Sequence, residues 1–251
     1  MERKFLNYRK TECTNNCLYC FTRWEAEDIK YDNLCDFRDN VIVYPMCNAD
    51  ISPLEKSDEI LEYLERCLSM QSKFSIISIS TKSNLSGSFI ECIKNINNKY
   101  KENGFIKISV SFSCKYNIEI IEPSANPYST RLSLLSNIAH YGIPHSVILK
   151  PILPFVDLKE YCEIIDDIKM FSDAVVLGAL YVDHDDMFYK EYINKKYQDK
   201  KKNILWLKEN KAWSTVESTD KIIKIKEYII EKDIRYFDSD SEYLHFLVDG
   251  R

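Results

Sequence analysis

Two patterns of hydrophobic and polar positions alternate along most of the chain. Short apolar runs rich in β-branched residues are separated by longer amphipathic stretches. This alternation is typical of βα units around a parallel sheet. The apolar runs predict strands at Lys4–Arg9, Asn40–Pro45, Phe74–Ser80, Ile106–Ser113, Ser146–Ile152 and Val175–Tyr181. The amphipathic stretches predict helices near Pro53–Ser69, Gly87–Asn103, Ser129–His140 and Leu158–Phe171.

Six such units predict an α/β fold, a partial (β/α)6 TIM-type barrel. The pattern changes after Tyr181, so we expect a core over residues 1–181 and a C-terminal extension over residues 182–251. We expect the extension to pack on the core and to serve substrate binding. Its pattern predicts helices at about Asp186–Asn210 and Glu217–Lys232, and a hairpin of Arg235–Phe237 with Tyr243–Val248.

Composition narrows the functional classes. The net charge is −5 and the pI about 5.5, which weighs against extensive binding of duplex DNA. The apolar runs are far shorter than a membrane span, so no membrane segment is expected. Nine cysteines without a recognisable export signal predict a reducing, cytoplasmic environment.

Three cysteines near the N-terminus carry the clearest chemical signal. Cys13, Cys17 and Cys20 have the spacing CxxxCxxC, which places three thiols on one short loop. Thiolates are the ligands of iron–sulfur clusters, and three would leave one iron of a [4Fe–4S] cluster without a protein ligand. An open position on a metal is where a substrate or cofactor binds. Zinc is the alternative, although no CxxC or paired histidine downstream supplies a fourth ligand.

This motif, with Tyr19 before its last cysteine, resembles the radical S-adenosylmethionine (SAM) superfamily. The resemblance implies that the open iron binds the amino and carboxylate groups of SAM, and that Tyr19 lies beside the cofactors. Further motifs at the predicted strand ends resemble the spore photoproduct lyase-like branch of the superfamily, over about Thr11 to Pro154. They are Cys47-Asn48-Ala49-Asp50, Ser80-Thr81-Lys82-Ser83, Ser111-Phe112-Ser113 and Glu122-Pro123 followed by Arg131-Leu132.

The charged residues of these motifs suit the cofactor. Lys82 offers a point cation and Arg131 a planar fork for the SAM carboxylate. Asp50 lies where the family has a Gly-Gly-Glu segment, and it could accept the SAM ammonium. The alternatives are a solvated Lys82, and an Arg131 that pairs with Glu122.

Two serines of the same motifs suit the ribose of SAM. Ser111 and Ser113 alternate along one strand, so both hydroxyls would face the same side. Only one of them needs to contact SAM. Either serine could instead satisfy a neighbouring backbone group.

Cys47 is a candidate catalytic residue. A cysteine three residues before an aspartate donates a hydrogen atom to the substrate radical in spore photoproduct lyase, and Cys47 with Asp50 has that spacing. However, Phe21 occupies the position of the lyase's relay tyrosine, and phenylalanine has no O–H group. The alternative is a buried thiol that only packs, and we expect that outcome.

The stretch Lys190–Lys211 contains eight lysines and three acidic residues, with aromatic residues between them. It could bind a phosphate backbone and stack bases. The alternative is a solvated helix whose aromatic residues pack on the barrel. Nucleic acid is therefore a candidate partner, but not the favoured one.

The sequence favours a radical SAM enzyme that uses a [4Fe–4S] cluster and SAM on a small molecule, nucleotide or peptide. An electron donor such as flavodoxin or ferredoxin is the expected partner. Two alternatives stay open: a DNA repair enzyme like spore photoproduct lyase, and a non-catalytic iron–sulfur or zinc-binding regulatory module.

Overall fold

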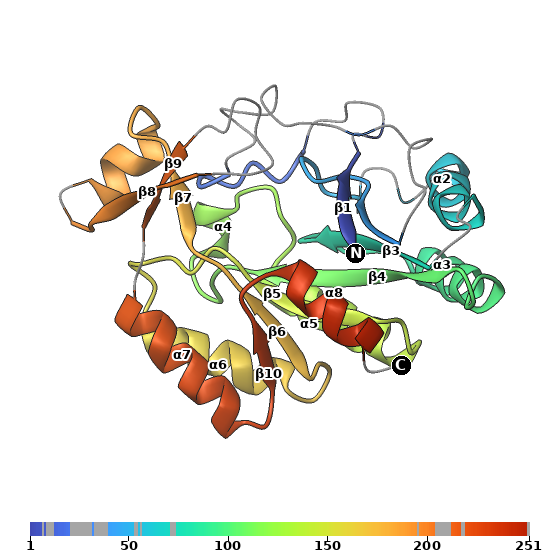
Figure 1. The fold of residues 1–251 in the computed structure, drawn as a ribbon. Coiled ribbons are helices and arrows are strands. Elements are labelled where there is room, and N and C mark those ends of the chain that lie inside the picture. Colours follow the sequence, from blue (N-terminus) through green and yellow to red (C-terminus); the bar gives the residue numbers. More distant parts are fainter. Residues whose placement is uncertain are drawn as a thin grey trace.

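A curled, seven-stranded parallel sheet forms the centre of the molecule (Figure 1). The computed structural model describes residues 1–6, 8, 13–20, 32, 40–52, 55, 57–70, 74–194, 196–203, 212–216 and 219–249. The strand order is β1-β2-β3-β4-β5-β6-β10. The strands are β1 Glu2–Phe5, β2 Val41–Tyr44, β3 Ser75–Thr81, β4 Gly104–Phe112, β5 His145–Leu149, β6 Ala174–Leu177 and β10 Arg235–Phe237. The predicted partial TIM-type barrel is thus confirmed, with a seventh strand added beside β6.

Amphipathic helices cover the outer face of this half-barrel. They are α2 Asp58–Ser69, α3 Gly87–Lys99, α5 Tyr128–His140 and α6 Leu158–Ile168, with the short α4 Ile118–Ile121 before α5. Each of the four longer helices buries one apolar side, as Leu64 of α2 and Ile164 of α6 illustrate. These side chains form one core with alternate strand residues such as Ile77 and Val147. Burial of this core drives the βα units to close around the sheet.

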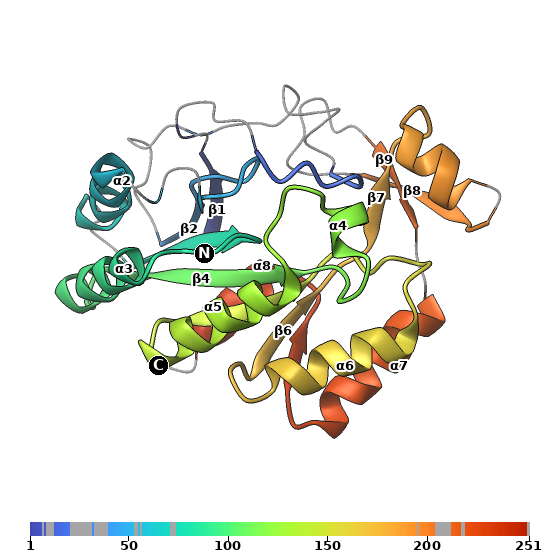
Figure 2. The ribbon, with the colours of Figure 1, turned by 180° about the vertical axis from the view of Figure 1, so that it is seen from behind.

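The inner face of the half-barrel is covered differently. Helix α8 (Asp240–Asp249) lies on the face opposite to α5, as Figures 1 and 2 show from the two sides. Its Tyr243 and Leu244 pack with Ile76 and Phe105 near the amino ends of the strands. An apolar floor therefore closes the inner face at that end.

Polar side chains form the next layer of the inner face. Lys107 is fully buried in β4, and its ammonium pairs with Asp240 of α8 and donates to Ser109. Asp240 also accepts from Ser78 Oγ at 2.7 Å. Because a buried ammonium requires a counter-charge, Asp240 fixes α8 against β4. Towards the carboxyl ends of the strands, Ser80 of β3 and Ser111 of β4 line the pocket described below.

A small antiparallel sheet follows the barrel strands. It contains β7 Leu180–Val182, β9 Ala212–Val216 and β8 Asp199–Asn203, in the order β7-β9-β8. A short π-helix, Tyr189–Ile193, precedes β8. The helix predicted over Asp186–Asn210 is therefore confirmed only at its start, over residues 187–193. It is wrong over Asp199–Asn203, where β8 pairs with β9 across a reversal of the chain. Residues 195 and 204–210 of that prediction lie outside the described residues.

The predicted terminal hairpin is also wrong. Helix α7 (Thr219–Glu231), which confirms the second predicted helix, returns the chain so that β10 pairs with β6 in parallel. The segment Tyr243–Val248 belongs to α8 and forms no strand. The C-terminal part thus contributes a strand to the barrel, while the domain division at residue 181 stays a prediction. None of the helices in the described ranges is long and apolar enough to cross a membrane.

Candidate active site

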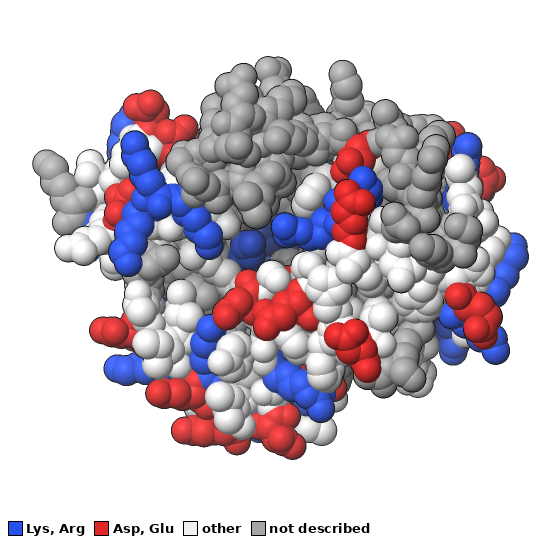
Figure 3. All heavy atoms as spheres, viewed as in Figure 1, with Lys and Arg blue, Asp and Glu red and all other residues white. Residues whose placement is uncertain are grey.

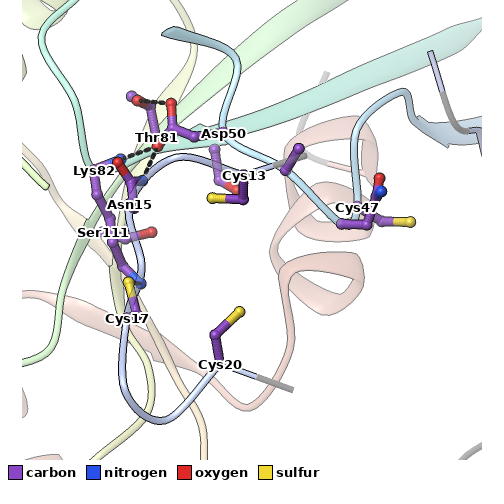
Figure 4. Close-up of a pocket in the computed structure, with 12 residues that line it drawn as sticks. Cys13, Asn15, Cys17, Cys20, Cys47, Asp50, Thr81, Lys82 and Ser111 are labelled. Carbon is purple, nitrogen blue, oxygen red and sulfur yellow. Dashed lines mark hydrogen bonds between the residues drawn. The ribbon is translucent and has the colours of Figure 1, made fainter. Parts of the chain in front are cut away.

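A pocket opens at the carboxyl ends of strands β2, β3 and β4, beside the cysteine loop (Figure 4). Seven of the ten predicted site residues line it: Cys13, Cys17, Cys20, Cys47, Asp50, Lys82 and Ser111. The lining is completed by Asn15 of the cysteine loop and by four members of the strand-end motifs to which the sequence assigned no role: Asn48, Ala49, Ser80 and Thr81. The other three predicted residues, Tyr19, Ser113 and Arg131, are buried and are not part of the lining.

The cysteine loop is held by hydrogen bonds on both sides. Leu18 N donates to Ile121 O of α4 at 3.0 Å. Asn15 is buried, donates to Asp50 Oδ2 at 2.8 Å and accepts from Ser83 Oγ at 3.2 Å. Asn16 takes the left-handed conformation, with φ +50°, which asparagine tolerates better than most residues. The loop is therefore shaped by the protein, and the thiols lie on the pocket wall.

Asp50 joins three segments of the site. Its carboxylate accepts from Asn15 Nδ2, from Thr81 Oγ1 at 2.7 Å, from Lys82 N at 2.7 Å and from Ser52 N at 2.9 Å. A carboxylate has about four lone-pair positions, so these four donors occupy its acceptor capacity. The predicted contact of Asp50 with the SAM ammonium would require one of these bonds to break. In this arrangement Asp50 braces the cysteine loop against β2 and β3.

Lys82 lies between the cysteine loop and a buried carboxylate. Its Nζ is 3.4 Å from Cys17 Sγ, donates to Tyr19 Oη at 2.8 Å and lies 3.4 Å from Glu122 Oε1. Tyr19 in turn donates to Glu122. Lys82 is therefore not a solvated surface lysine, and its ammonium reaches the pocket wall next to a predicted cluster ligand. That position suits a contact with a carboxylate bound in the pocket.

Glu122 is central to this site, although the sequence indicates it only as a partner of Arg131. It is buried, and burial alone would raise its pKa, but Lys82, Arg131 and two hydroxyl donors lower the pKa to about 2. Ser113 Oγ donates to Glu122 at 2.7 Å. The sequence does contain an indication of its importance, because Glu122 is the first residue of the Glu-Pro motif.

Arg131 lies behind the pocket. Its side chain is fully buried, and Nη2 pairs with Glu122 Oε2 at 2.5 Å. Nε donates to Asn126 O at 2.8 Å and Nη1 to Ser111 O at 3.0 Å. Arg131 therefore forms the ion pair with Glu122 that the sequence offered as the alternative to a contact with SAM. All three guanidinium nitrogens contact protein groups. The guanidinium therefore supports the end of β4 from behind.

The two serines separate in the structure. Ser111 lies in β4 and lines the pocket, where its hydroxyl can meet a ribose. Ser113 lies beyond the end of β4, is fully buried and donates to Glu122. The strand ends at Phe112, so the alternation that predicted a common face does not extend to Ser113.

The thiol chemistry of the three cysteines fits an iron–sulfur cluster. In the described residues, no group of three or more His, Cys, Asp or Glu side chains converges on one metal position. A cubane cluster takes one thiolate per iron, so its cysteines surround it at separate positions. Burial raises the pKa of Cys17 to about 11, against the effect of Lys82, and burial also raises the pKa of Cys13. Thiols of this kind become thiolates when a metal supplies the positive charge.

Cys47 lies apart from the three cysteines of the CxxxCxxC motif. It lines the same pocket, but in Figure 4 its thiol points away from Cys13, Cys17 and Cys20. Burial raises its pKa to about 12, so it is a protonated thiol at neutral pH. Its role as hydrogen-atom donor stays a prediction, and Phe21 lies outside the described residues.

Comparison with known proteins shows similarity of structure alone. No protein-family model matches the chain, and no curated protein matches its sequence. Spore photoproduct lyase complexed with dinucleoside spore photoproduct superposes with a TM-score of 0.61 at 13% identity, over 88% of this chain and 71% of the lyase. A lyase structure with bound AdoMet and the same dinucleoside gives the same values.

A second enzyme shares the architecture. Methylornithine synthase (PylB) superposes with a TM-score of 0.54 at 10% identity, over 94% of this chain and 64% of the synthase. At these identities the likeness establishes the fold. The resemblance predicted from the cysteine and strand-end motifs is confirmed at this level: the chain has the fold of the radical SAM enzymes, with spore photoproduct lyase among its structural neighbours.

Proposed function

We propose that this chain is a radical SAM enzyme that binds a [4Fe–4S] cluster through Cys13, Cys17 and Cys20. The observation that carries the proposal is the meeting of these three thiols with Lys82 and Ser111 in one pocket. The pocket lies at the carboxyl ends of parallel strands, where barrels of this type place their chemistry. The fold shared with enzymes of this superfamily supports the proposal.

Each lining residue has a distinct task in this proposal. The three cysteines would hold the cluster, which in its reduced form would supply the electron for cleavage of SAM to methionine and a 5′-deoxyadenosyl radical. Lys82 neutralises the carboxylate of SAM, and Ser111 contacts its ribose. Asp50 and the pair of Glu122 with Arg131 hold these groups in place from behind. An electron donor such as flavodoxin or ferredoxin would supply the reducing equivalent.

A photoproduct-type repair activity is the second candidate. It is favoured by the extent of the structural likeness to spore photoproduct lyase and by the position of Cys47 in the pocket. The acidic net charge and Phe21 weigh against it. We therefore favour modification of a small molecule, nucleotide or peptide over repair of a DNA photoproduct.

Anaerobic purification and reconstitution test the proposal. The expected result is a brown protein with iron and sulfide in cluster stoichiometry that converts SAM to 5′-deoxyadenosine when dithionite is added. A cluster without SAM cleavage would favour the non-catalytic iron–sulfur module. Tightly bound zinc without iron would favour the zinc module, and either outcome would overturn the proposed function.

A further inference from the structure

Lys150 lies on the inner face of the half-barrel, beyond the pocket described above. In the parallel pairing of β4 with β5, Ser111 lies opposite Ile148, and Lys150 follows two residues later. Lys150 lies one residue beyond the end of β5, and its ammonium interacts electrostatically with Asp240, the inner-face carboxylate that pairs with Lys107. Gly178 leaves room for it: a Cβ at Gly178 would come within 2.5–2.8 Å of the Lys150 side-chain carbons.

The part of the chain that the structure describes supplies no counter-ion to the ammonium of Lys150. Among the described residues it makes no ion pair and no hydrogen bond, and its closest recorded contact is the ring of Tyr181, 5.6 Å away at the centroid. The other inner-face lysines differ in this respect. Lys107 pairs with Asp240, and Lys82 pairs with Glu122.

The surroundings of Lys150 disfavour its protonated, charged form. Its side chain reaches solvent, but the protein atoms around it partly desolvate the ammonium, which lowers the pKa of Lys150. The positive charge of Lys202 in β8 lowers the pKa of Lys150 further, whereas the negative charge of Asp240 raises it. The Asp240 carboxylate, however, already pairs with Lys107 and accepts a hydrogen bond from Ser78. Lys150 and Lys202 are thus close enough to repel each other, and the one described carboxylate that acts on Lys150, that of Asp240, is already paired. A negatively charged ligand would relieve this imbalance.

Figure 3 shows a hollow on this side of the molecule with Lys or Arg atoms in its floor, above the acidic residues that flank α8. A compound bound there would extend from the carboxyl end of β5 towards Ser111 and the cysteine loop. Lys150 and Ser111 are on neighbouring strands, and Lys150 is two residues beyond Ile148, the residue opposite Ser111. A ligand of metabolite size can therefore span both positions.

We propose that Lys150, assisted by Lys202, binds an anionic group of the substrate, a phosphate or a carboxylate. The assignment of this ligand as substrate rests on the proposed function. The anion site itself does not, because it requires neither cluster nor SAM. The structure thereby narrows the substrate class to compounds that carry at least one such group.

The test is an isothermal titration of the full chain with inorganic phosphate and, separately, with acetate. We expect saturable binding of at least one probe that weakens as ionic strength rises. Lys150→Met should weaken it about tenfold or more, since a charged contact is lost. Lys101→Met, at an exposed side chain, is the matched control and should leave affinity unchanged. Tighter binding of phosphate would assign a phosphate group, and tighter binding of acetate a carboxylate.

A second variant keeps the charge and moves it. In Gly178→Ala the new methyl group displaces the Lys150 side chain, so anion affinity should fall severalfold although every lysine is retained. Equal affinity in the wild type, Lys150→Met and Lys101→Met would overturn the proposal, as would failure of both probes to bind. Competition between SAM and the bound probe would assign Lys150 to the SAM site and also overturn it. Probe binding by a chain that cannot cleave SAM would support the anion site and overturn the proposed function.

Discussion

Asn15, which lies between the first two cysteines, donates from Nδ2 to Asp50 Oδ2 at 2.8 Å. This bond joins the cysteine loop to the end of β2, and the same carboxylate accepts from Thr81 and Lys82 at the end of β3. The loop that would hold the cluster is thus attached to two barrel strands through one buried acid. The fold and the predicted metal site are mechanically connected at Asp50.

Asp50→Asn should weaken this connection. The new amide group would face donors that the carboxylate now satisfies, and an unsatisfied buried group costs roughly 1–3 kcal/mol. We expect a loss of that size in the free energy of unfolding measured with urea, and poorer retention of reconstituted iron. Asp185→Asn, at an exposed loop position, is the control. Unchanged stability of Asp50→Asn would show that the four hydrogen bonds contribute nothing net.

The cysteines give the most direct prediction. Changing Cys13, Cys17 or Cys20 to Ala should abolish the visible absorption of the reconstituted cluster and SAM cleavage together, because three ligands already leave one iron open. Cys92→Ala, on helix α3 and outside the pocket, should retain both. Iron content in Cys17→Ala equal to that of the wild type would contradict the ligand assignment.

Lys82→Ala should affect SAM more than the cluster. Removal of the ammonium takes away the proposed partner of the SAM carboxylate, which corresponds to on the order of 1.5–3 kcal/mol in binding free energy. The measurement is equilibrium binding of SAM to the reconstituted protein, with iron content determined in parallel. Lys82→Arg, which keeps the charge, should retain part of the affinity. If SAM bound equally well to the Ala variant, Lys82 would serve only the buried network with Tyr19 and Glu122.

Glu122 should make stability depend on acid. Its folded pKa of about 2 lies below the ordinary 4.5, so its contribution is fully present above about pH 4.5 and is lost as pH falls towards 2. A difference of that size corresponds to about 3 kcal/mol. Urea unfolding between pH 7 and pH 2.5 should show this loss for the wild type.

Two variants check the assignment to Glu122. Glu122→Gln should be destabilised already at pH 7, because Arg131 stays buried without its counter-charge, and should lose less across the acid range. Glu102→Gln, at an exposed side chain, should follow the wild-type curve. Identical acid dependence in all three proteins would assign the loss to other carboxylates.

Cys47→Ala separates packing from catalysis. Because the Cys47 thiol points away from the cluster cysteines, we expect the variant to cleave SAM, to form the same product and to lose only modest stability. The measurement, once the substrate is known, is the ratio of product to 5′-deoxyadenosine. Accumulation of uncoupled 5′-deoxyadenosine, or an altered product, would instead identify Cys47 as the hydrogen-atom donor.

Local pattern alone was enough to predict much of the barrel. The apolar runs from Phe74 and Ile106 form β3 and β4, and the stretches from Gly87 and Leu158 form α3 and α6, because each is compatible with one period and one buried face. The cysteine spacing and the strand-end motifs brought seven predicted residues to one pocket. In a parallel barrel the strand ends meet at one edge, so strand order along the sequence already implies that proximity.

Other features depended on partners distant in sequence. The lysine-rich strand β8 has little β propensity of its own and exists because β9 pairs with it, and β10 forms only because α7 returns the chain to β6. Side-chain roles were decided in the same way. Arg131 pairs with Glu122, and Asp50 accepts hydrogen bonds from four donors. Lys150 forms no ion pair with any described residue. The sequence by itself determined which chemical groups are present and in which order along the strands. Only the tertiary structure decided which of them are satisfied by one another and which remain free for a ligand, because burial and pairing arise from contacts between distant segments.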